Sequence, residues 1–222
     1  MRRVDAERVR ERNRRIFASA FGAVYDFYMW HAVVGRFVAL AVWGSDIRPY
    51  YESMDAIGEV ADGSIIVDVP CGSGAALRAL RPEQRVRYLG FDLSPSMLER
   101  AGRRARRLGL ARVTLTVAEA DALPVEEGAA ELFLSYFGLH CFPDPAAAIR
   151  EAARCLRSGG RLVGTTIVRG QRRLDRLRVR PGTGAFGPVG DDADLGRWLA
   201  DAGFGGVEIE RDGVFAMFRA QR

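Results

Sequence analysis

From residue 64 to the end of the chain, short apolar runs rich in β-branched residues alternate with stretches of helical periodicity. The apolar runs predict strands at 65–69, 86–91, 113–117, 130–135 and 161–166. The stretches between them predict helices at 75–80, 95–108 and 145–156. This alternation is typical of parallel strands joined by crossover helices, so we expect an α/β sheet with helices on both faces.

The last part of the chain has a different pattern. A predicted helix at 193–202 is followed by strands at 207–211 and 214–219, and the Asp212-Gly213 pair between them is a strong hairpin signal. The strands of a hairpin are antiparallel, so the sheet should end with an antiparallel strand. The predicted fold class is therefore α/β, with a doubly wound, Rossmann-like, seven-stranded sheet that is mostly parallel.

Two segments do not follow this pattern. Residues 1–60 have helical periodicity and many aromatic side chains, and 168–190 form an insertion rich in Gly, Pro and Arg. We expect residues 1–60 to form an N-terminal helical cap on a core of residues 61–222, with 168–190 as a lid insertion. The aromatic side chains of the cap fit an ordinary core, and they equally fit a roof over a ligand.

The composition is that of an ordinary globular protein, with 48% hydrophobic and 27% charged residues. The formal net charge is +5, and all 33 basic residues are arginine. Because arginine occurs throughout the chain, the charge favours a solvated surface over a polyanion site, and we expect no specific nucleic-acid partner. The absence of lysine excludes Schiff-base catalysis.

Cysteine spacing and hydropathy favour a cytoplasmic protein. Cys71, Cys141 and Cys155 have no C-x-x-C spacing and do not pair evenly, so we predict neither a metal site nor a disulfide framework. The apolar segment 16–43 is interrupted by charged residues before it reaches the roughly 20 residues of a membrane span. We therefore expect no transmembrane segment.

A glycine loop follows the first predicted strand. Residues 65–69 run directly into Pro70-Cys71-Gly72-Ser73-Gly74, and a helix comes next. Gly72 and Gly74 allow a ligand to contact the backbone, and the helix start offers unpaired amides, so the loop predicts a cofactor site. A structural turn is the alternative. Leu77 stands where a dinucleotide fingerprint has its third glycine, which argues against a nicotinamide cofactor.

Acidic residues follow the next two predicted strands. Asp92 ends the second strand, where a carboxylate can accept hydrogen bonds from ribose hydroxyls, and a helix cap is its alternative role. Asp121 follows the third strand and can accept from an adenine amino group, while the Ala122 amide can donate to the ring. Because the carboxyl ends of parallel strands meet at one crevice, we expect these residues and the glycine loop to bind one adenosyl ligand.

Four motifs together resemble the class I S-adenosylmethionine-dependent methyltransferases: residues 68–74, Phe91-Asp92, 120–122 and 157–162. The chain most resembles the type 11 subgroup related to the ubiquinone and menaquinone biosynthesis methyltransferases, through Tyr25-Asp26 and 159–162. The resemblance implies S-adenosyl-L-methionine as cofactor and in-line methyl transfer. It also implies a set of cofactor-binding residues: Asp68, Gly72, Gly74, Asp92, Leu93, Met97, Asp121, Ala122 and Ser135.

Family resemblance also assigns roles within that set. Asp68 orders the loop near the methionine amino group, and the carbonyl of Ser135 meets the same amino group. Leu93 and Met97 line the adenine.

The predicted acceptor is a small hydrophobic or aromatic molecule that is methylated on oxygen or carbon. Such an acceptor must lose a proton, which an imidazole can take near neutral pH. His140, after the fourth strand, is the first candidate base, with a hydrogen bond to backbone as its alternative role. His31 in the cap is the second, with packing as its alternative. A non-catalytic S-adenosylmethionine-binding protein and a nicotinamide-dependent oxidoreductase are the competing functions, and the sequence leaves a homodimer open.

Overall fold

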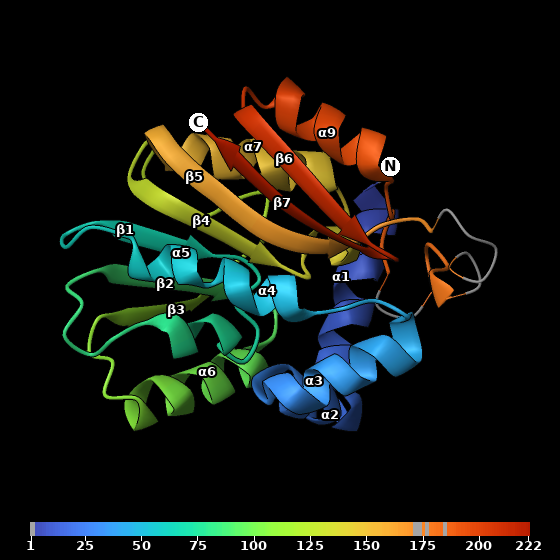
Figure 1. Cartoon of the computed structure of the whole chain (residues 1–222), viewed down its shortest axis with the longest axis horizontal. Coiled ribbons are helices and arrows are strands. Elements are labelled where there is room, and N and C mark those ends of the chain that lie inside the picture. Colours follow the sequence, from blue (N-terminus) through green and yellow to red (C-terminus); the bar gives the residue numbers. More distant parts are fainter. Residues whose placement is uncertain (1–2, 171–174, 176–177, 184–185) are drawn as a thin grey trace.

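The computed structural model describes residues 3–170, 175, 178–183 and 186–222. These residues form a seven-stranded sheet of order β3-β2-β1-β4-β5-β7-β6 (Figure 1). The strands are β1 (Ile65–Asp68), β2 (Arg87–Asp92), β3 (Val113–Val117), β4 (Ala130–Tyr136), β5 (Leu156–Ile167), β6 (Gly205–Asp212) and β7 (Phe215–Gln221). Strands β1 to β5 pair in parallel, and β7 is antiparallel to both β5 and β6. The predicted fold class is confirmed.

The central strands lie where the apolar runs predicted them. In β1 and β4 nearly every side chain is buried, because both faces of a central parallel strand are covered by helices. β5 is longer than predicted, since it begins at Leu156, which pairs with Ala130 before a register shift. At Gly160 an added Cβ would meet the Ala130 carbonyl oxygen at 3.1 Å, so the shift depends on glycine there.

Helices cover both faces of the sheet (Figure 1). On one face lie α4 (Arg48–Ser53), α5 (Asp55–Gly58) and α6 (Pro95–Arg107), whose side chains share a core with β1 and β2. On the other lie α7 (Pro145–Cys155) and α9 (Asp192–Asp201). The predicted helix at 75–80 is a short 3₁₀ helix, η2 (Ala75–Ala79). The two-sided cover leaves the carboxyl ends of the parallel strands as the open edge.

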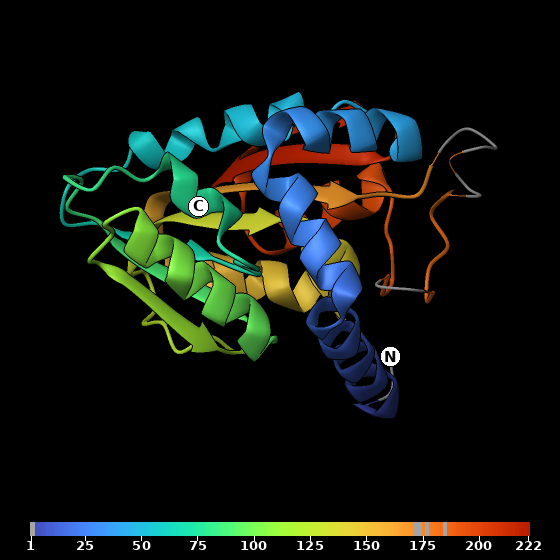
Figure 2. The same cartoon turned by 90° about the horizontal axis from the view of Figure 1, so that it is seen from below.

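The first helices of the chain cross that edge. They are α1 (Arg3–Ala18), α2 (Ala20–Trp30), α3 (Ala32–Val38) and the π-helical turn η1 (Ala39–Trp43). Ser19 separates α1 from α2, and its side chain accepts a hydrogen bond from the Phe21 amide, as an N-cap does. Figures 1 and 2 show α1 and α2 running past the strand ends.

The predicted lid at 168–190 lies partly outside the described residues. Where it is described, it contacts α1, because the Arg12 guanidinium donates to the carbonyls of Gly182 at 2.7 Å and Phe186 at 2.5 Å. Within the described ranges, no helix is both long enough and apolar enough to cross a bilayer. The same ranges contain no group of three or more metal-ligating His, Cys, Asp or Glu side chains.

Candidate active site

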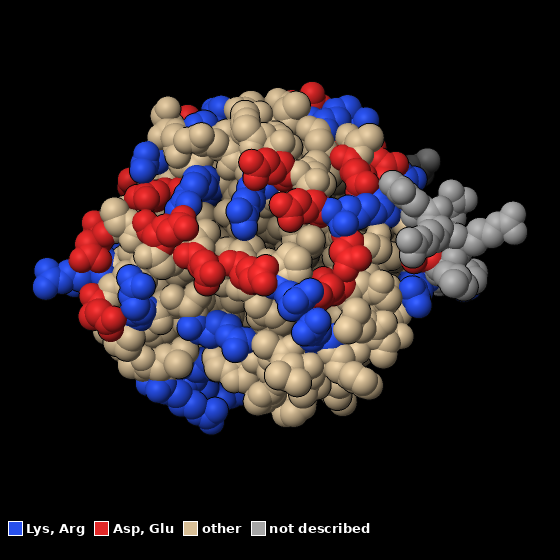
Figure 3. Space-filling view, viewed as in Figure 1, with Lys and Arg blue, Asp and Glu red and all other residues tan. Residues whose placement is uncertain are grey.

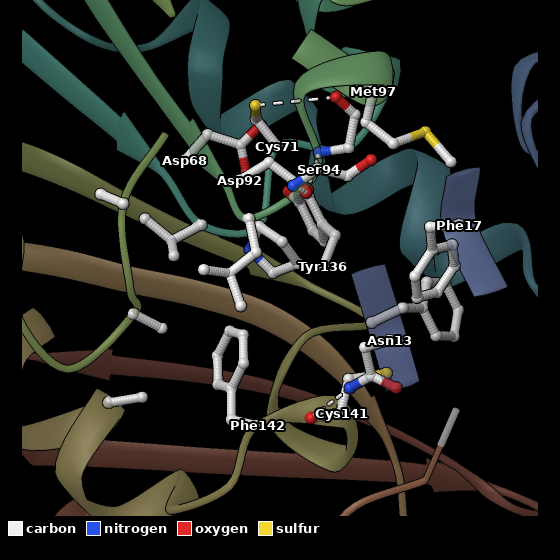
Figure 4. Close-up of a pocket in the computed structure, with 18 of the residues that line it drawn as sticks. Asn13, Phe17, Asp68, Cys71, Asp92, Ser94, Met97, Tyr136, Cys141 and Phe142 are labelled. Carbon is white, nitrogen blue, oxygen red and sulfur yellow. Dashed lines mark hydrogen bonds between the residues drawn. The ribbon is translucent and has the colours of Figure 1, made fainter. Parts of the chain in front are cut away.

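A cavity opens at the carboxyl ends of β1, β2 and β4, between the sheet and the first two helices (Figure 4). Its volume is about 1170 Å³, including the part open to solvent. The cavity therefore lies where the strand-end rule for open α/β sheets places a ligand.

Asp68, the last residue of β1, lines the cavity and is 1% exposed. Its Oδ2 accepts a hydrogen bond from the Tyr88 hydroxyl. Its Oδ1 is buried and has no hydrogen-bond partner among the described residues. Burial raises the pKa of Asp68 to about 7. A buried acceptor without a partner is costly, so this oxygen is suited to a ligand that brings a donor.

Asp92 at the end of β2 also lines the cavity. Its Oδ2 accepts from the Gly72 amide at 2.9 Å and its Oδ1 from the Ser94 amide at 2.8 Å. Burial raises the pKa of Asp92 to about 6. Each carboxylate oxygen keeps a free lone pair, so Asp92 can orient the loop and the start of α6 and still accept from a ligand.

The two loop glycines have different roles. Gly72 has φ of +52°, and an added Cβ would meet no atom within 4 Å, so its missing side chain leaves open space at the cavity. Gly74 has φ of +83° and does not line the cavity. An added Cβ there would lie 2.6 Å from Leu77 and 3.1 Å from Ala101. Gly74 therefore allows close packing of the loop against α6.

The predicted adenine end is built around Asp121, which lines the cavity together with Leu93 and Met97. Arg10 of α1 reaches across to this end, with its guanidinium 2.7 Å from Glu119 and 3.4 Å from Asp121. This places α1 over the loop that follows β3.

Six of the nine predicted cofactor residues line the cavity, and Gly74, Ala122 and Ser135 do not. The Ala122 amide donates to the Glu119 carbonyl at 3.2 Å, so it is engaged within its own turn. Ser135 is 3% exposed and borders a smaller pocket behind the main cavity. The structure therefore brings the predicted residues at the ends of β1 and β2 together in one cavity. It places Gly74, Ala122 and Ser135 outside the lining of that cavity.

No histidine is among the described residues that line the cavity, and both candidate bases lie elsewhere. His140 is buried, and its Nδ1 accepts a hydrogen bond from the Ile167 amide at 3.1 Å. Burial lowers the pKa of His140 to about 3, so the ring stays neutral. His31 is exposed at the break between α2 and α3, with its ring 4.5 Å from that of Phe27. These positions fit the alternative roles better than catalysis, namely a hydrogen bond to the backbone for His140 and packing for His31.

The sequence predicted aromatic side chains of the N-terminal helices as one possible roof over the ligand, but it missed Asn13 and Met29 and did not say which aromatic residues reach the cavity. Asn13 and Phe17 come from α1, and Tyr25 and Met29 from α2. Each pair is spaced by four residues, so each lies on one face of its helix, and that spacing is a signal present in the sequence. Together with Tyr50, Tyr136, Phe137 and Phe142 they form what we call the aromatic wall of the cavity. Figure 4 shows Phe17 and Phe142 on the side of the cavity away from Asp68 and Asp92.

Two features of this wall are polar. Asn13 is 8% exposed, and its Nδ2 donates to the Cys141 carbonyl at 2.7 Å, while its Oδ1 has no partner among the described residues. Burial raises the pKa of the Tyr25 and Tyr50 hydroxyls well above 10.0, so both phenols stay protonated. The wall thus offers neutral hydrogen-bonding groups in an apolar surround.

The sheet order and the acidic residues at its strand ends agree with the class I S-adenosylmethionine-dependent methyltransferases that the sequence motifs resemble. Residues 67–164 match the family described as "Methyltransferase domain". Over residues 67–164 the chain therefore matches a methyltransferase domain, and S-adenosylmethionine is the cofactor of the class that its motifs resemble. The unpartnered Asp68 Oδ1 and the open space at Gly72 fit a cofactor that carries an ammonium group.

Curated relatives and solved structures agree with this assignment. The chain is 35% identical over 125 residues to demethylmenaquinone methyltransferase of Thermus thermophilus, covering 56% of each protein. It is 34% identical over 120 residues to malonyl-[acyl-carrier protein] O-methyltransferase of Hahella chejuensis, covering 53% of this chain and 41% of that protein. Phosphoethanolamine N-methyltransferase 2 of Haemonchus contortus, solved with S-adenosyl-L-methionine, has the same fold, with a TM-score of 0.73 at 15% identity over 95% of this chain and 60% of that one.

The chain spans between about a third and about half of the length of the curated relatives it matches. The family match begins in β1, after the helices that contribute half of the aromatic side chains of the wall. The comparisons therefore support the fold and the methyl donor, and they do not identify the acceptor.

Proposed function

We propose that this chain transfers the methyl group of S-adenosylmethionine to an oxygen or carbon atom of a small hydrophobic or aromatic molecule. The observation that carries the proposal is the mixed polar and aromatic lining of one cavity. Asp68, Asp92 and Gly72 are polar or open positions that suit the cofactor, and aromatic side chains such as Phe17 and Tyr25 line the same cavity. An apolar pocket with few polar groups selects an acceptor mainly by shape and apolar contact.

The proposed role of the protein is alignment. S-adenosylmethionine supplies a methyl group that is already electrophilic, so holding the acceptor in line and in contact accounts for much of the rate. Asp68 accepts from the ammonium group, and Asp92 accepts from the ribose hydroxyls while it fixes the loop. Tyr25 and Tyr50, as neutral phenols, act as hydrogen-bond donors toward the acceptor. The aromatic side chains exclude water from the reacting atoms.

The proposal does not include a histidine base, because His140 and His31 lie outside the cavity lining. We propose instead that the acceptor loses its proton to solvent before methyl transfer. The pH profile of kcat/KM should then follow the pKa of the acceptor and shift when a more acidic analogue is used. A profile that stays fixed across acceptors of different acidity would point to a protein base.

The test uses purified protein, methyl-labelled S-adenosylmethionine and a panel of phenols, enolisable carbonyl compounds and, for contrast, primary amines. Label should move to an oxygen or carbon acceptor, as identified by mass spectrometry. The Asp92→Ala variant is the control that should lose this transfer. Calorimetric titration with S-adenosylmethionine and with NAD runs in parallel. Cofactor binding without transfer to any member of the panel would favour a non-catalytic binding protein, and NAD binding would favour an oxidoreductase.

A further inference from the structure

The first helices carry most of the exposed apolar surface of the protein. Of the ten large hydrophobic side chains exposed among the described residues, eight lie between residues 21 and 42. They form what we call the apolar face of α2, α3 and η1: Phe21, Val24, Phe27, Val33, Val34, Phe37, Leu40 and Val42. Val33 is 85% exposed and Phe37 is 74% exposed. Contiguous exposed apolar surface on a soluble fold marks an interaction site.

The helices that carry this face are held together and nearly free of charge. An added Cβ on Gly35 of α3 would lie 2.6 Å from the Tyr28 carbonyl oxygen of α2, so the two helices cross in close contact. Between residues 20 and 45 the charged side chains are Asp26, which turns inward to Ser73 and Arg104, and Arg36. Figure 3 shows uncharged surface at the lower centre and right of the molecule, where Figure 1 places α2 and α3.

A basic surface adjoins the apolar face. α6 contacts α2 through Arg104, whose guanidinium lies 2.6 Å from Asp26 and 4.2 Å from the centroid of the Trp30 ring. On its outer side α6 exposes Arg103, Arg106 and Arg107. The ion pairs recorded for α6 within the described residues involve Arg100 and Arg104, not these three. Figure 3 shows a group of basic side chains at the lower left, over α6.

We propose that the apolar face docks on an anionic lipid bilayer. An apolar helix face inserts into the boundary between head groups and acyl chains, and adjacent arginines attract anionic head groups. Phe27, Val33 and Phe37 enter the bilayer surface, while Arg103 and Arg107 contact lipid phosphates. The helices lie on the membrane and do not span it.

Charge favours a bilayer over a second copy of the chain. A two-fold dimer through the apolar face brings the arginines of both α6 helices toward one interface, because an isologous contact uses the same surface twice. Against three outer arginines, α6 exposes one acidic side chain, Glu99. Like charges brought together at an interface oppose association, whereas an anionic lipid surface neutralises them.

The same helix that carries this face also lines the cavity. Tyr25 and Met29 of α2 face the cavity, whereas Phe21, Val24 and Phe27 face outward. A lipophilic molecule dissolved in the bilayer therefore meets a helix whose other side forms the wall of the candidate active site. The lipid-binding proposal itself does not depend on the proposed methyl transfer, because vesicle binding is measured without cofactor or acceptor.

The experiment is co-sedimentation of the protein with vesicles of phosphatidylcholine alone and of phosphatidylcholine with phosphatidylglycerol. The protein should partition onto the anionic vesicles, and binding should fall as salt is raised. The double variant Val33→Glu/Phe37→Glu should lose about tenfold or more of the partition coefficient. The matched control is Val207→Glu, because Val207 is an exposed apolar residue on β6, away from this face.

The basic surface is tested separately. Arg103→Glu/Arg107→Glu should reduce binding to anionic vesicles about tenfold or more, while Arg85→Glu/Arg87→Glu, on exposed residues elsewhere, should not. All four variants replace exposed side chains, and thermal unfolding checks that each one folds. Binding that is absent, or that is unchanged in both test variants, overturns the proposal. Light scattering tests the alternative of a second copy. If the parent chain is a dimer that does not bind vesicles, and Val33→Glu/Phe37→Glu makes it monomeric, the apolar face binds a second copy and the lipid proposal is overturned.

Discussion

The Arg104 guanidinium of α6 lies 2.6 Å from the carboxylate of Asp26 on α2. It also donates to the carbonyl of Ser73 at 2.8 Å, and the Ser73 hydroxyl donates to Asp26. A single arginine therefore ties the first helices of the chain to the glycine loop. The cofactor side of the cavity depends on helices that lie outside the family match.

Replacing Asp26 by alanine should lower the free energy of unfolding by about 1 to 3 kcal/mol, because Arg104 is left without its charged partner in a partly buried position. The affinity for S-adenosylmethionine should also fall, since Ser73 loses its contact with α2. Circular dichroism melting and calorimetric titration measure the two effects. The control is Glu11→Ala, because Glu11 pairs with Arg15, which is 79% exposed, and such a pair contributes less than about 1 kcal/mol. Equal losses in both variants would contradict the anchoring role.

The pH dependence of the protein should reflect two buried carboxyl groups. Burial raises the pKa of Asp68 from 3.8 to about 7 and that of Asp92 to about 6. The folded protein therefore holds these protons more tightly than the unfolded chain. The resulting stabilisation is complete below pH 3.8 and is lost as the pH rises through about 6 to 7. The contribution of the two carboxyl groups should accordingly fall between about pH 4 and pH 7. His140, whose pKa is lowered from 6.5 to about 3, offsets part of this loss, because only the unfolded chain binds its proton in most of that range.

Cofactor affinity should change in the opposite direction. An ammonium group beside Asp68 favours the ionised carboxylate, so the affinity for S-adenosylmethionine should rise between about pH 5.5 and pH 8. Calorimetric titration across this range measures the rise. Asp68→Asn removes the titrating group, and its pH dependence should be flatter, while the cofactor's own titration is the same in both proteins. Parallel curves for the two proteins would show that Asp68 is not linked to binding.

The sheet and the carboxylates of the site could be predicted from the sequence because their signals are local. The run that ends in Asp68 is apolar on both faces, and Asp92 ends the next strand, so the strand-end rule for parallel sheets brings them together. The same rule does not say which way a side chain turns after a strand. Ser135 follows the rule in position, yet it borders a separate pocket behind the cavity.

The acceptor side could not be derived in this way, because it depends on how separate helices cross. The four-residue spacing of Asn13 with Phe17 shows that they share a helix face, but not that the face meets the sheet edge. His140 shows that a position after a strand end does not by itself place a side chain in the cavity. Its place after β4 suggested the crevice, and the backbone turn into the 3₁₀ helix Leu139–Cys141 directs the ring to the Ile167 amide instead.

Replacing His140 by asparagine should therefore affect stability more than catalysis. The buried Ile167 amide loses its acceptor or gains a poorer one, at a cost of about 1 to 3 kcal/mol in the free energy of unfolding. The pH profile of kcat for the folded fraction should keep its shape. Denaturant unfolding and a pH series of turnover rates measure both effects. Loss of a pH limb near neutrality, with stability unchanged, would restore His140 as a base. His31→Ala, at an exposed position, should change neither quantity.

The two strand-end aspartates should differ in their importance for the cofactor. Asp92 is held by the Gly72 and Ser94 amides, so Asp92→Ala removes a ligand acceptor and frees the glycine loop at once. We expect a loss of about 3 kcal/mol, or roughly a hundredfold, in affinity for S-adenosylmethionine. The Asp121 side chain is 31% exposed and already lies 3.4 Å from Arg10, so Asp121→Ala should cost about tenfold or less. Calorimetric titration of both variants with S-adenosylmethionine gives the ratio directly. Because Asp92 acts on the loop as well as on the ligand, equal losses at the two positions would mean that the cofactor is held mainly at its adenine end.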